Sequence, residues 1–137
     1  MVIRSKPWIQ QYSPKKIKEV VGQDKAVAEL KKFVLNFKQE KKKATLIYGP
    51  TGSGKTSAVY SIANEIGLEI VELNASDFRT AEQINSIVGN ASKQMSLFFK
   101  GKIILVDEID GVSGAQDRGG IPEIVRMIDE TKFPIIL

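Results

Sequence analysis

The chain has 137 residues, of which 42% are hydrophobic and 26% charged, and this composition is typical of one soluble globular domain. It contains no cysteine and no histidine, which excludes disulfides, thiolate chemistry, histidine acid–base catalysis and zinc sites with imidazole ligands. No apolar run approaches the roughly 20 residues of a membrane span, and the N-terminus lacks the apolar core of a signal peptide. We therefore expect a cytoplasmic protein with no membrane contact.

The net charge of +4 is divided unevenly along the chain. Residues 1–43 hold 12 basic and 4 acidic side chains, a net of +8, whereas residues 44–137 hold 8 and 12, a net of −4. Such a basic segment can contact nucleic acid or an acidic protein. The simpler interpretation is a solvated helix surface, and it applies best to the run Lys38, Lys41, Lys42 and Lys43.

Apolar spacing predicts the first elements of the chain. A helix with Asp24 as its N-cap runs to about residue 41, because its apolar residues recur at helical spacing. Residues 45–48 form a buried strand, and residues 49–54 form a loop. Residues 55–66 form a helix that stops at Gly67. The apolar positions of the first helix are Val27, Leu30, Val34 and Phe37, and those of the second are Val59, Ile62, Ala63 and Ile66.

Strands and helices continue to alternate in the second half. Strands are predicted over residues 70–73, 103–106 and 135–137, and helices over residues 80–95 and 121–129. The last helix carries Ile121, Ile124, Val125 and Ile128. Alternation with uniformly apolar strands predicts an α/β fold whose parallel sheet is sandwiched by helices. Because the final strand ends without a turn, we expect a longer natural protein.

Residues 49–56 match the P-loop pattern G-x-x-x-x-G-K-[ST] between a predicted strand and a predicted helix. The glycines let successive backbone N–H groups face phosphate oxygens, and the helix N-terminus adds its positive dipole end. Lys55 would neutralise the β- and γ-phosphates, and the Thr56 hydroxyl would ligate Mg²⁺. A glycine-rich turn that merely caps a helix is the simpler alternative. The predicted nucleotide-binding residues are Gly49, Pro50, Thr51, Gly52, Ser53, Gly54, Lys55, Thr56 and Ser57.

Asp107 and Glu108 follow the apolar strand at residues 103–106. The carboxyl end of that strand lies beside the P-loop in an open α/β sheet, so Asp107 can hold Mg²⁺. Glu108 can polarise a water for attack on the γ-phosphate, although an acidic pair can also simply start a helix. GTPases more often orient water with Gln, and no Asn-Lys-x-Asp segment is present. The pattern therefore favours ATP as the nucleotide and an ATPase as the activity.

Several segments together carry a family resemblance. They are Trp8 with Tyr12-Ser13-Pro14, residues 19–23, the P-loop, residues 72–77, residues 106–111 and residues 117–121. These segments resemble clamp-loader AAA+ ATPases, and residues 110–121 together with Ile109 are similar to the large subunits of replication factor C rather than to the small subunits. The absence of cysteine and the short loops suggest an archaeal-type protein, in which case it would be nucleoid-associated. The resemblance covers residues 8–137 and implies an AAA+ core that stops before the sheet and the helical lid are complete.

The resemblance implies further site residues. Residues 1–23 would contribute to the adenine pocket, and residues 24–137 would form the P-loop core. Asn74 would face the catalytic centre and hold Glu108 in check, although it is otherwise a turn-forming residue. Arg118 would face duplex DNA, although an arginine in a glycine-rich loop is otherwise unremarkable. The pocket residues carried over are Tyr12, Pro14, Val20, Val21 and Gly22.

A short apolar segment at the end of the helix predicted over residues 80–95 stands out, because a polar loop is expected there. Exposed aromatic pairs tend to mark partner sites, and this segment resembles a shortened form of the motif used by sliding-clamp partners. The alternative is that these side chains complete the core. The predicted clamp-binding residues are Gln94, Met95, Leu97, Phe98 and Phe99.

Two functions remain open at this stage. The resemblance implies an ATP-binding subunit of the sliding-clamp loader, which uses ATP binding and hydrolysis to load the DNA polymerase clamp onto primed DNA. Its partners would be replication factor C small subunits, the sliding clamp and primer–template DNA. The alternative is an AAA+ fragment that binds partners or nucleotide without hydrolysing ATP on its own.

Overall fold

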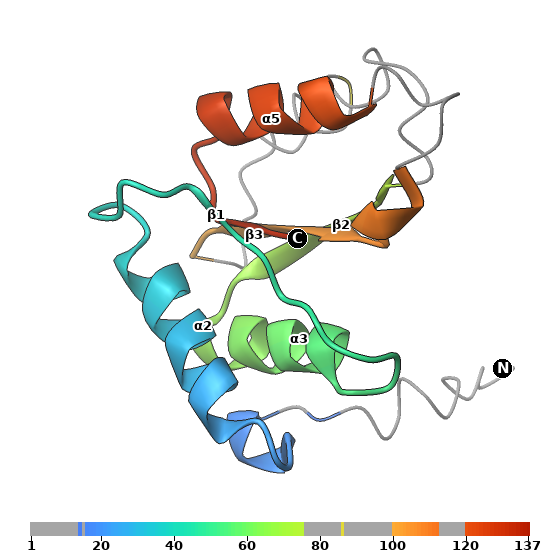
Figure 1. The fold of residues 1–137 in the computed structure, drawn as a ribbon. Helices are drawn as coiled ribbons and strands as arrows, with labels where there is room; N and C mark the ends of the chain where they lie inside the picture. Colours follow the sequence, from blue (N-terminus) through green and yellow to red (C-terminus); the bar gives the residue numbers. More distant parts are fainter. Residues whose placement is uncertain (1–13, 15, 76–85, 87–99, 113–119) are drawn as a thin grey trace, which may run out of the picture.

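Four parallel strands form the central layer of the molecule, with helices on both faces (Figure 1). The computed structural model describes residues 14, 16–75, 86, 100–112 and 120–137. Helix α5 (Gly120–Glu130) covers one face of the sheet, whereas α2 (Asp24–Asn36) and α3 (Lys55–Ile66) cover the other. The α/β sandwich predicted from the alternation of elements is confirmed.

The strands are ordered β1-β4-β3-β2. Their bounds are Ala44–Thr45 for β1, Glu69–Asn74 for β2, Lys102–Asp107 for β3 and Ile135–Ile136 for β4. Although β1 is short, the parallel pairing continues beyond it, because the Ile47 N–H donates to the Leu137 carbonyl at 2.8 Å. The prediction of a fully buried strand over residues 45–48 is wrong for Leu46 and Tyr48, which are exposed.

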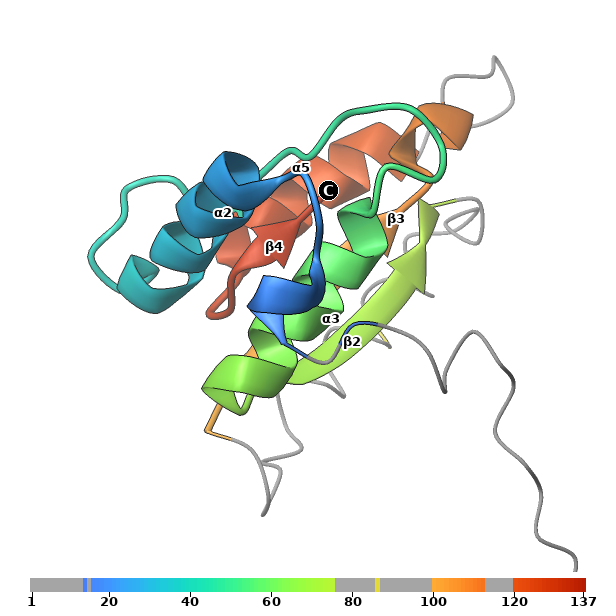
Figure 2. The same ribbon diagram turned by 90° about the horizontal axis from the view of Figure 1, so that it is seen from below.

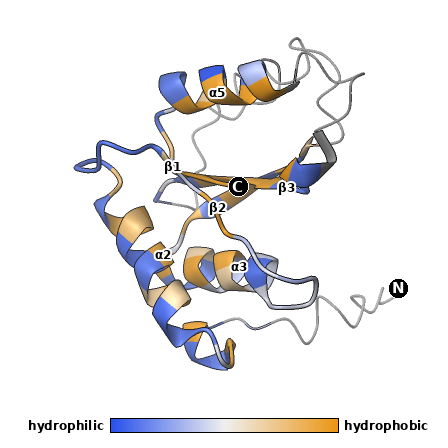
Figure 3. Ribbon diagram, viewed as in Figure 1, coloured by the Kyte–Doolittle hydropathy of each residue, from blue (hydrophilic) through white to orange (hydrophobic). Residues whose placement is uncertain are grey.

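The strands divide the core into two clusters, one on each face (Figure 3). Ile103, Leu105 and Ile136 face α2 and α3, whereas Ile104 and Val106 face α5. Successive side chains of a strand point to opposite faces, so a strand covered on both sides needs an apolar residue at every position. The continuous apolar run in β3 follows from this double burial.

The helices on the face of α2 and α3 pack side by side, as Figure 2 shows from below. Helix α3 begins and ends as predicted, and Gly67 terminates it in the left-handed region at a φ of 80°. The prediction that the preceding helix runs to about residue 41 is wrong, because α2 ends at Asn36. The N–H groups of Gln39 and Glu40 donate to the Asn36 carbonyl and turn the chain, and residues 38–42 are exposed, so a longer helix would have no apolar face to bury.

The opposite face is covered by α5, which follows the short 3₁₀ helix η3 (Ile109–Val112). The apolar residues of this helix are buried only in part: Ile121 and Val125 remain 52% and 51% exposed, whereas Ile124 and Met127 are buried. Two overlapping apolar stripes satisfy helical spacing in this segment, and contact with the sheet selects the one that contains Met127. In the described part of the chain, no helix is long and apolar enough to cross a membrane.

Several predicted features lie outside the described residues. They are the helix over residues 80–95 apart from Ser86, the loop over residues 113–119 with Arg118, the pocket residue Tyr12, and the clamp-binding segment Gln94, Met95, Leu97, Phe98 and Phe99.

Candidate nucleotide-binding site

The P-loop connects the segment after β1 to the first turn of α3. Gly52 and Gly54 have φ values of 79° and 86°, in the left-handed region that side chains with a Cβ rarely adopt. A Cβ at either position would meet no atom within 4 Å. The loop therefore needs glycine at these two positions for its backbone conformation and not for space.

The Lys55 ammonium folds back onto the start of the loop. Its Nζ donates to the carbonyl oxygens of Gly49 at 2.7 Å and of Pro50 at 3.0 Å. Both acceptors are neutral, and hydrogen bonds between an ammonium and phosphate oxygens are stronger. A triphosphate bound in the loop could therefore take these hydrogen bonds over with a gain in free energy.

Thr56 and Asp107 meet between α3 and β3. Thr56 lies in the first turn of α3, Asp107 is the last residue of β3, and the Thr56 hydroxyl donates to Asp107 Oδ2 at 3.3 Å. A hydroxyl beside a carboxylate is an oxygen pair that Mg²⁺ accepts. The described residues contain no group of three or more acidic, histidine or cysteine side chains that could hold a metal. Mg²⁺ would thus share these oxygens with phosphate and water, which is its usual coordination in nucleotide sites.

Glu108 and Asn74 meet at the same edge of the sheet. Asn74 pairs in register with Asp107, and its Nδ2 donates to Glu108 Oε2 at 3.1 Å. Glu108 has a φ of 57° and is the one non-glycine residue with a positive φ among those described. Its own N–H donates to Asp107 Oδ1 at 2.9 Å. A positive φ is uncommon in residues other than glycine, and such conformations cluster at functional sites.

Tyr60 and Glu72 form a further polar pair beside this site, and no motif predicts them from the sequence. The Tyr60 hydroxyl donates to the Glu72 carboxylate. This hydrogen bond, together with burial and the negative charges of Glu72 and Asp107, raises the pKa of Tyr60 to about 12. Two signals could have indicated the pair: Tyr60 lies one helical turn after Thr56, and Glu72 interrupts an apolar strand.

The predicted adenine-pocket residues are spread over different environments. Val20 is buried in the core, Val21 is 90% exposed, and the Pro14 carbonyl accepts a hydrogen bond from Ser61. A cavity of about 480 Å³ lies beside the P-loop, and its walls come from α2, the segment after β1, and the loop itself. Gln23 lines it, next to Gly22, but Pro14, Val20, Val21 and Gly22 do not.

A glycine-rich loop between a strand and a helix, with an acidic strand end beside it on a parallel sheet, defines a P-loop NTPase. The profile of the ATPase family associated with various cellular activities (AAA) matches residues 45–135, more than half of the chain. The chain therefore belongs to the AAA family of ATPases.

Individual relatives show which group of proteins within that family the chain is similar to. The chain is similar to proteins named replication factor C large subunit from three organisms. Identity is 52% in Nanoarchaeum equitans, with 97% of this chain and 31% of the relative covered. Identity is 50% in Staphylothermus marinus, with 96% of this chain and 31% of the relative covered. It is 45% in Aeropyrum pernix, with 96% of this chain and 28% of the relative covered. The predicted resemblance to archaeal large subunits is confirmed, and the chain spans about a third of the length of these curated relatives.

Proposed function

We propose that this chain is the ATP-binding part of a clamp-loader subunit, which uses ATP binding and hydrolysis to load the sliding clamp onto primed DNA. The observation that carries the proposal is the meeting of the Thr56–Asp107 and Asn74–Glu108 pairs at one edge of the sheet beside the P-loop. The relatives named replication factor C large subunit supply the choice of a clamp loader among AAA ATPases.

The triphosphate would bind along residues 49–57, with the loop N–H groups and Lys55 as its donors. Thr56 and Asp107 would hold Mg²⁺, which supplies positive charge to the β- and γ-phosphates when bound. The hydrogen bond of 3.3 Å between these two side chains supports that assignment, because it shows that the two oxygens lie next to each other.

Glu108 is the proposed general base of hydrolysis, and Asn74 is the residue proposed to hold it. The hydrogen bond from the Asn74 amide, at 3.1 Å, would hold Glu108 Oε2 toward Asn74 and not toward a water at the γ-phosphate. Glu108 would act only after it has turned from Asn74 toward the γ-phosphate. This arrangement supports an ATPase that binds ATP before it becomes competent to hydrolyse it.

The base of ATP is proposed to lie against residues 1–23, with residues 24–137 as the P-loop core. Tyr12, Pro14, Val20, Val21 and Gly22 remain the proposed pocket residues. Burial of Val20 and exposure of Val21 support a fixed backbone that presents Val21 outward. The cavity of about 480 Å³ beside Gln23 gives space for the ribose between this segment and the loop.

The remaining contacts of the proposed clamp loader rest on sequence alone. Arg118 is proposed to contact primer–template DNA, and the segment of residues 94–99 is proposed to contact the sliding clamp through Phe98 and Phe99. Replication factor C small subunits are the proposed neighbours. A cytoplasmic protein associated with the nucleoid would follow from this role.

The proposal is tested by calorimetric titration of the chain with ATP in the presence of Mg²⁺. Lys55→Ala should weaken ATP binding at least about tenfold, because it removes a charge-assisted phosphate contact worth over about 1.4 kcal/mol. Lys132→Ala is the matched control, since it removes an exposed lysine that follows α5 on the other face of the sheet. Near-normal ATP affinity in the Lys55 variant would contradict the proposal.

The second candidate is an AAA+ fragment that binds partners or nucleotide without hydrolysing ATP on its own. The chain spans about a third of the length of its curated relatives, and this observation favours it. Steady-state ATPase measurements with and without small subunits and primed DNA separate the two candidates. Turnover that appears only with the partners supports a clamp-loader ATPase, whereas none under any condition supports the fragment.

A further inference from the structure

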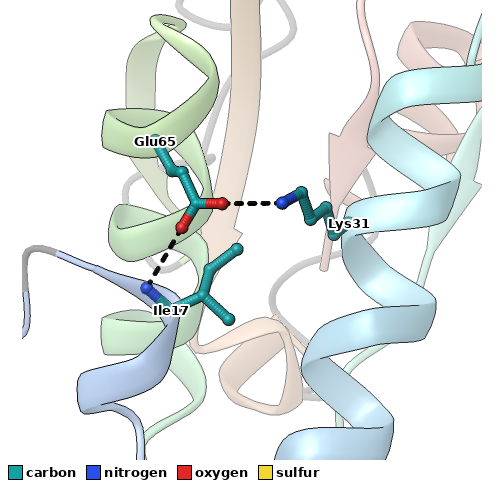
Figure 4. Close-up of polar contacts among 3 residues, drawn as sticks. All are labelled: Ile17, Lys31 and Glu65. Atoms are coloured by element: carbon teal, nitrogen blue, oxygen red, sulfur yellow. Dashed lines mark hydrogen bonds and ion pairs between the residues drawn. The ribbon is translucent and has the colours of Figure 1, made fainter.

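Two side chains of α3 hold the backbone of the segment that precedes α2. Ser61 Oγ, which has no solvent exposure, lies 3.0 Å from the Pro14 carbonyl and 2.8 Å from the Ser57 carbonyl of its own helix, so its single proton is shared between these two acceptors. The Ile17 N–H donates to Glu65 Oε2 at 3.4 Å (Figure 4). Ser61 and Glu65 are four residues apart, so they lie on the same face of the helix. One face of α3 therefore binds the main chain of this segment at two points.

The Glu65 carboxylate is itself fixed from a third element. Lys31 of α2 contacts Glu65 Oε1 at 2.7 Å, so the two oxygens of one carboxylate contact two different elements (Figure 4). The hydrogen bond from Lys31, aided by the Ile17 N–H, holds the pKa of Glu65 below its ordinary value and keeps the acceptor ionised. Val20, at the other end of the segment, is buried in the same core cluster as Ile62.

The same helix also carries the phosphate-binding residues. Lys55 and Thr56 form its first turn, and a rise of 1.5 Å per residue puts Ser61 about 9 Å and Glu65 about 15 Å further along the axis. A single straight helix thus fixes the distance between the P-loop and residues 14–20. A ligand that contacts both the P-loop and residues 14–20 would therefore span a distance that α3 sets.

We infer that Ser61 and Glu65 are positioning residues for the adenosine part of ATP, because they hold residues 14–20 at a fixed distance from the P-loop. This inference rests on the proposed function, in which that segment contacts the base. Neither side chain touches the nucleotide, since both act through the backbone at Pro14 and Ile17. They should therefore affect binding of the nucleoside without affecting binding of the phosphates.

The test compares ATP with inorganic tripolyphosphate, which offers the phosphates without the nucleoside. Dissociation constants for both ligands are measured by calorimetry with Mg²⁺ for the unmodified chain and the double variant Ser61→Ala, Glu65→Gln. Ser61→Ala removes the hydroxyl donor, and Glu65→Gln removes the charge that strengthens the bond from the Ile17 N–H, so ATP binding should weaken by about threefold or more. Tripolyphosphate binding should stay unchanged. Glu130→Gln is the control, since it removes an exposed ion pair with Arg126 on α5 and should change neither constant.

Each alternative result is informative. Equal weakening of both ligands in the double variant, or no weakening of either, overturns the inference. An unmodified chain that binds tripolyphosphate as tightly as ATP also overturns it, while phosphate binding at the P-loop stands. An unmodified chain that binds neither ligand refutes the proposed function as well. If the double variant melts before it can be titrated, Ser61→Ala alone, which preserves the buried volume, gives the same comparison.

Discussion

Replacing Ile62 with alanine should loosen the packing of the helix that carries the P-loop. Ile62 has no solvent exposure and belongs to the core cluster that joins α2 and α3 to β3 and β4. Removal of a large buried aliphatic side chain costs about 2–5 kcal/mol of unfolding free energy, from lost transfer energy and from the cavity that remains. The upper half of that range is expected here, because a helix on one side and the sheet on the other limit how far the site can collapse.

A smaller truncation at the same position should cost less unfolding free energy. Ile62→Val removes one carbon and should cost about 1 kcal/mol. Val125→Ala is the control, since its side chain lies 51% exposed on α5, and a change there should stay within about 0.5 kcal/mol. The assay is urea unfolding followed by circular dichroism, with the transition midpoint taken at constant slope.

The three variants should rank Ile62→Ala, Ile62→Val, Val125→Ala in the unfolding free energy that they lose. If Ile62→Ala costs no more than Val125→Ala, α3 does not pack on the sheet through Ile62, and the placement of the P-loop by this core is refuted. If the midpoint is unchanged but the slope differs, the variant has altered the unfolded ensemble instead, and the cavity argument fails.

Three further predictions concern polar groups, and four substitutions test them. Glu108→Gln in the complete subunit should keep ATP binding and lose hydrolysis at this site, because only activation of water needs the carboxylate, and unchanged single-turnover hydrolysis would contradict this. Tyr60 should titrate with a pKa of about 12, seen as a late rise in tyrosinate absorbance that Tyr60→Phe removes and that Glu72→Gln moves to lower pH. Because the pKa of Tyr60 is raised, its hydrogen bond stabilises the fold at pH values below 10.0, the ordinary pKa of tyrosine. This stabilisation is lost as the pH rises toward 12. The pKa of Glu65 is lowered from its ordinary value of 4.5, chiefly by the hydrogen bond from Lys31, so the pair should stabilise the fold above that pH and lose its effect as pH falls through the folded-state value. Urea midpoints of the unmodified chain and Glu65→Gln should therefore differ at neutral pH and converge in acid, and a difference that persists in acid would show that the charge is not responsible.

The sequence by itself determined the features that depend on local chemistry. Residues 49–56 were enough to predict a P-loop, because this pattern of glycines with Lys55 combines the backbone conformation and the charge. The end of α3 was set by Gly67, which adopts the left-handed conformation without a steric penalty. The unbroken apolar run of β3 was enough to predict a strand covered on both faces.

The tertiary structure decided whatever depends on which elements become neighbours. Periodicity gave two apolar stripes on α5, and contact with the sheet chose the one with Met127. The resemblance already implied the pairing of Asn74 with Glu108, and the register of β2 against β3 accounts for it. The pairing of Tyr60 with Glu72 could be seen only once α3 was packed against β2. For the same reason, no sequence motif predicts Ser61 and Glu65, the two anchors of the N-terminal segment. A hydrogen bond between residues distant in the chain depends on packing, and packing is set by the whole core at once and not by the spacing of residues along one segment.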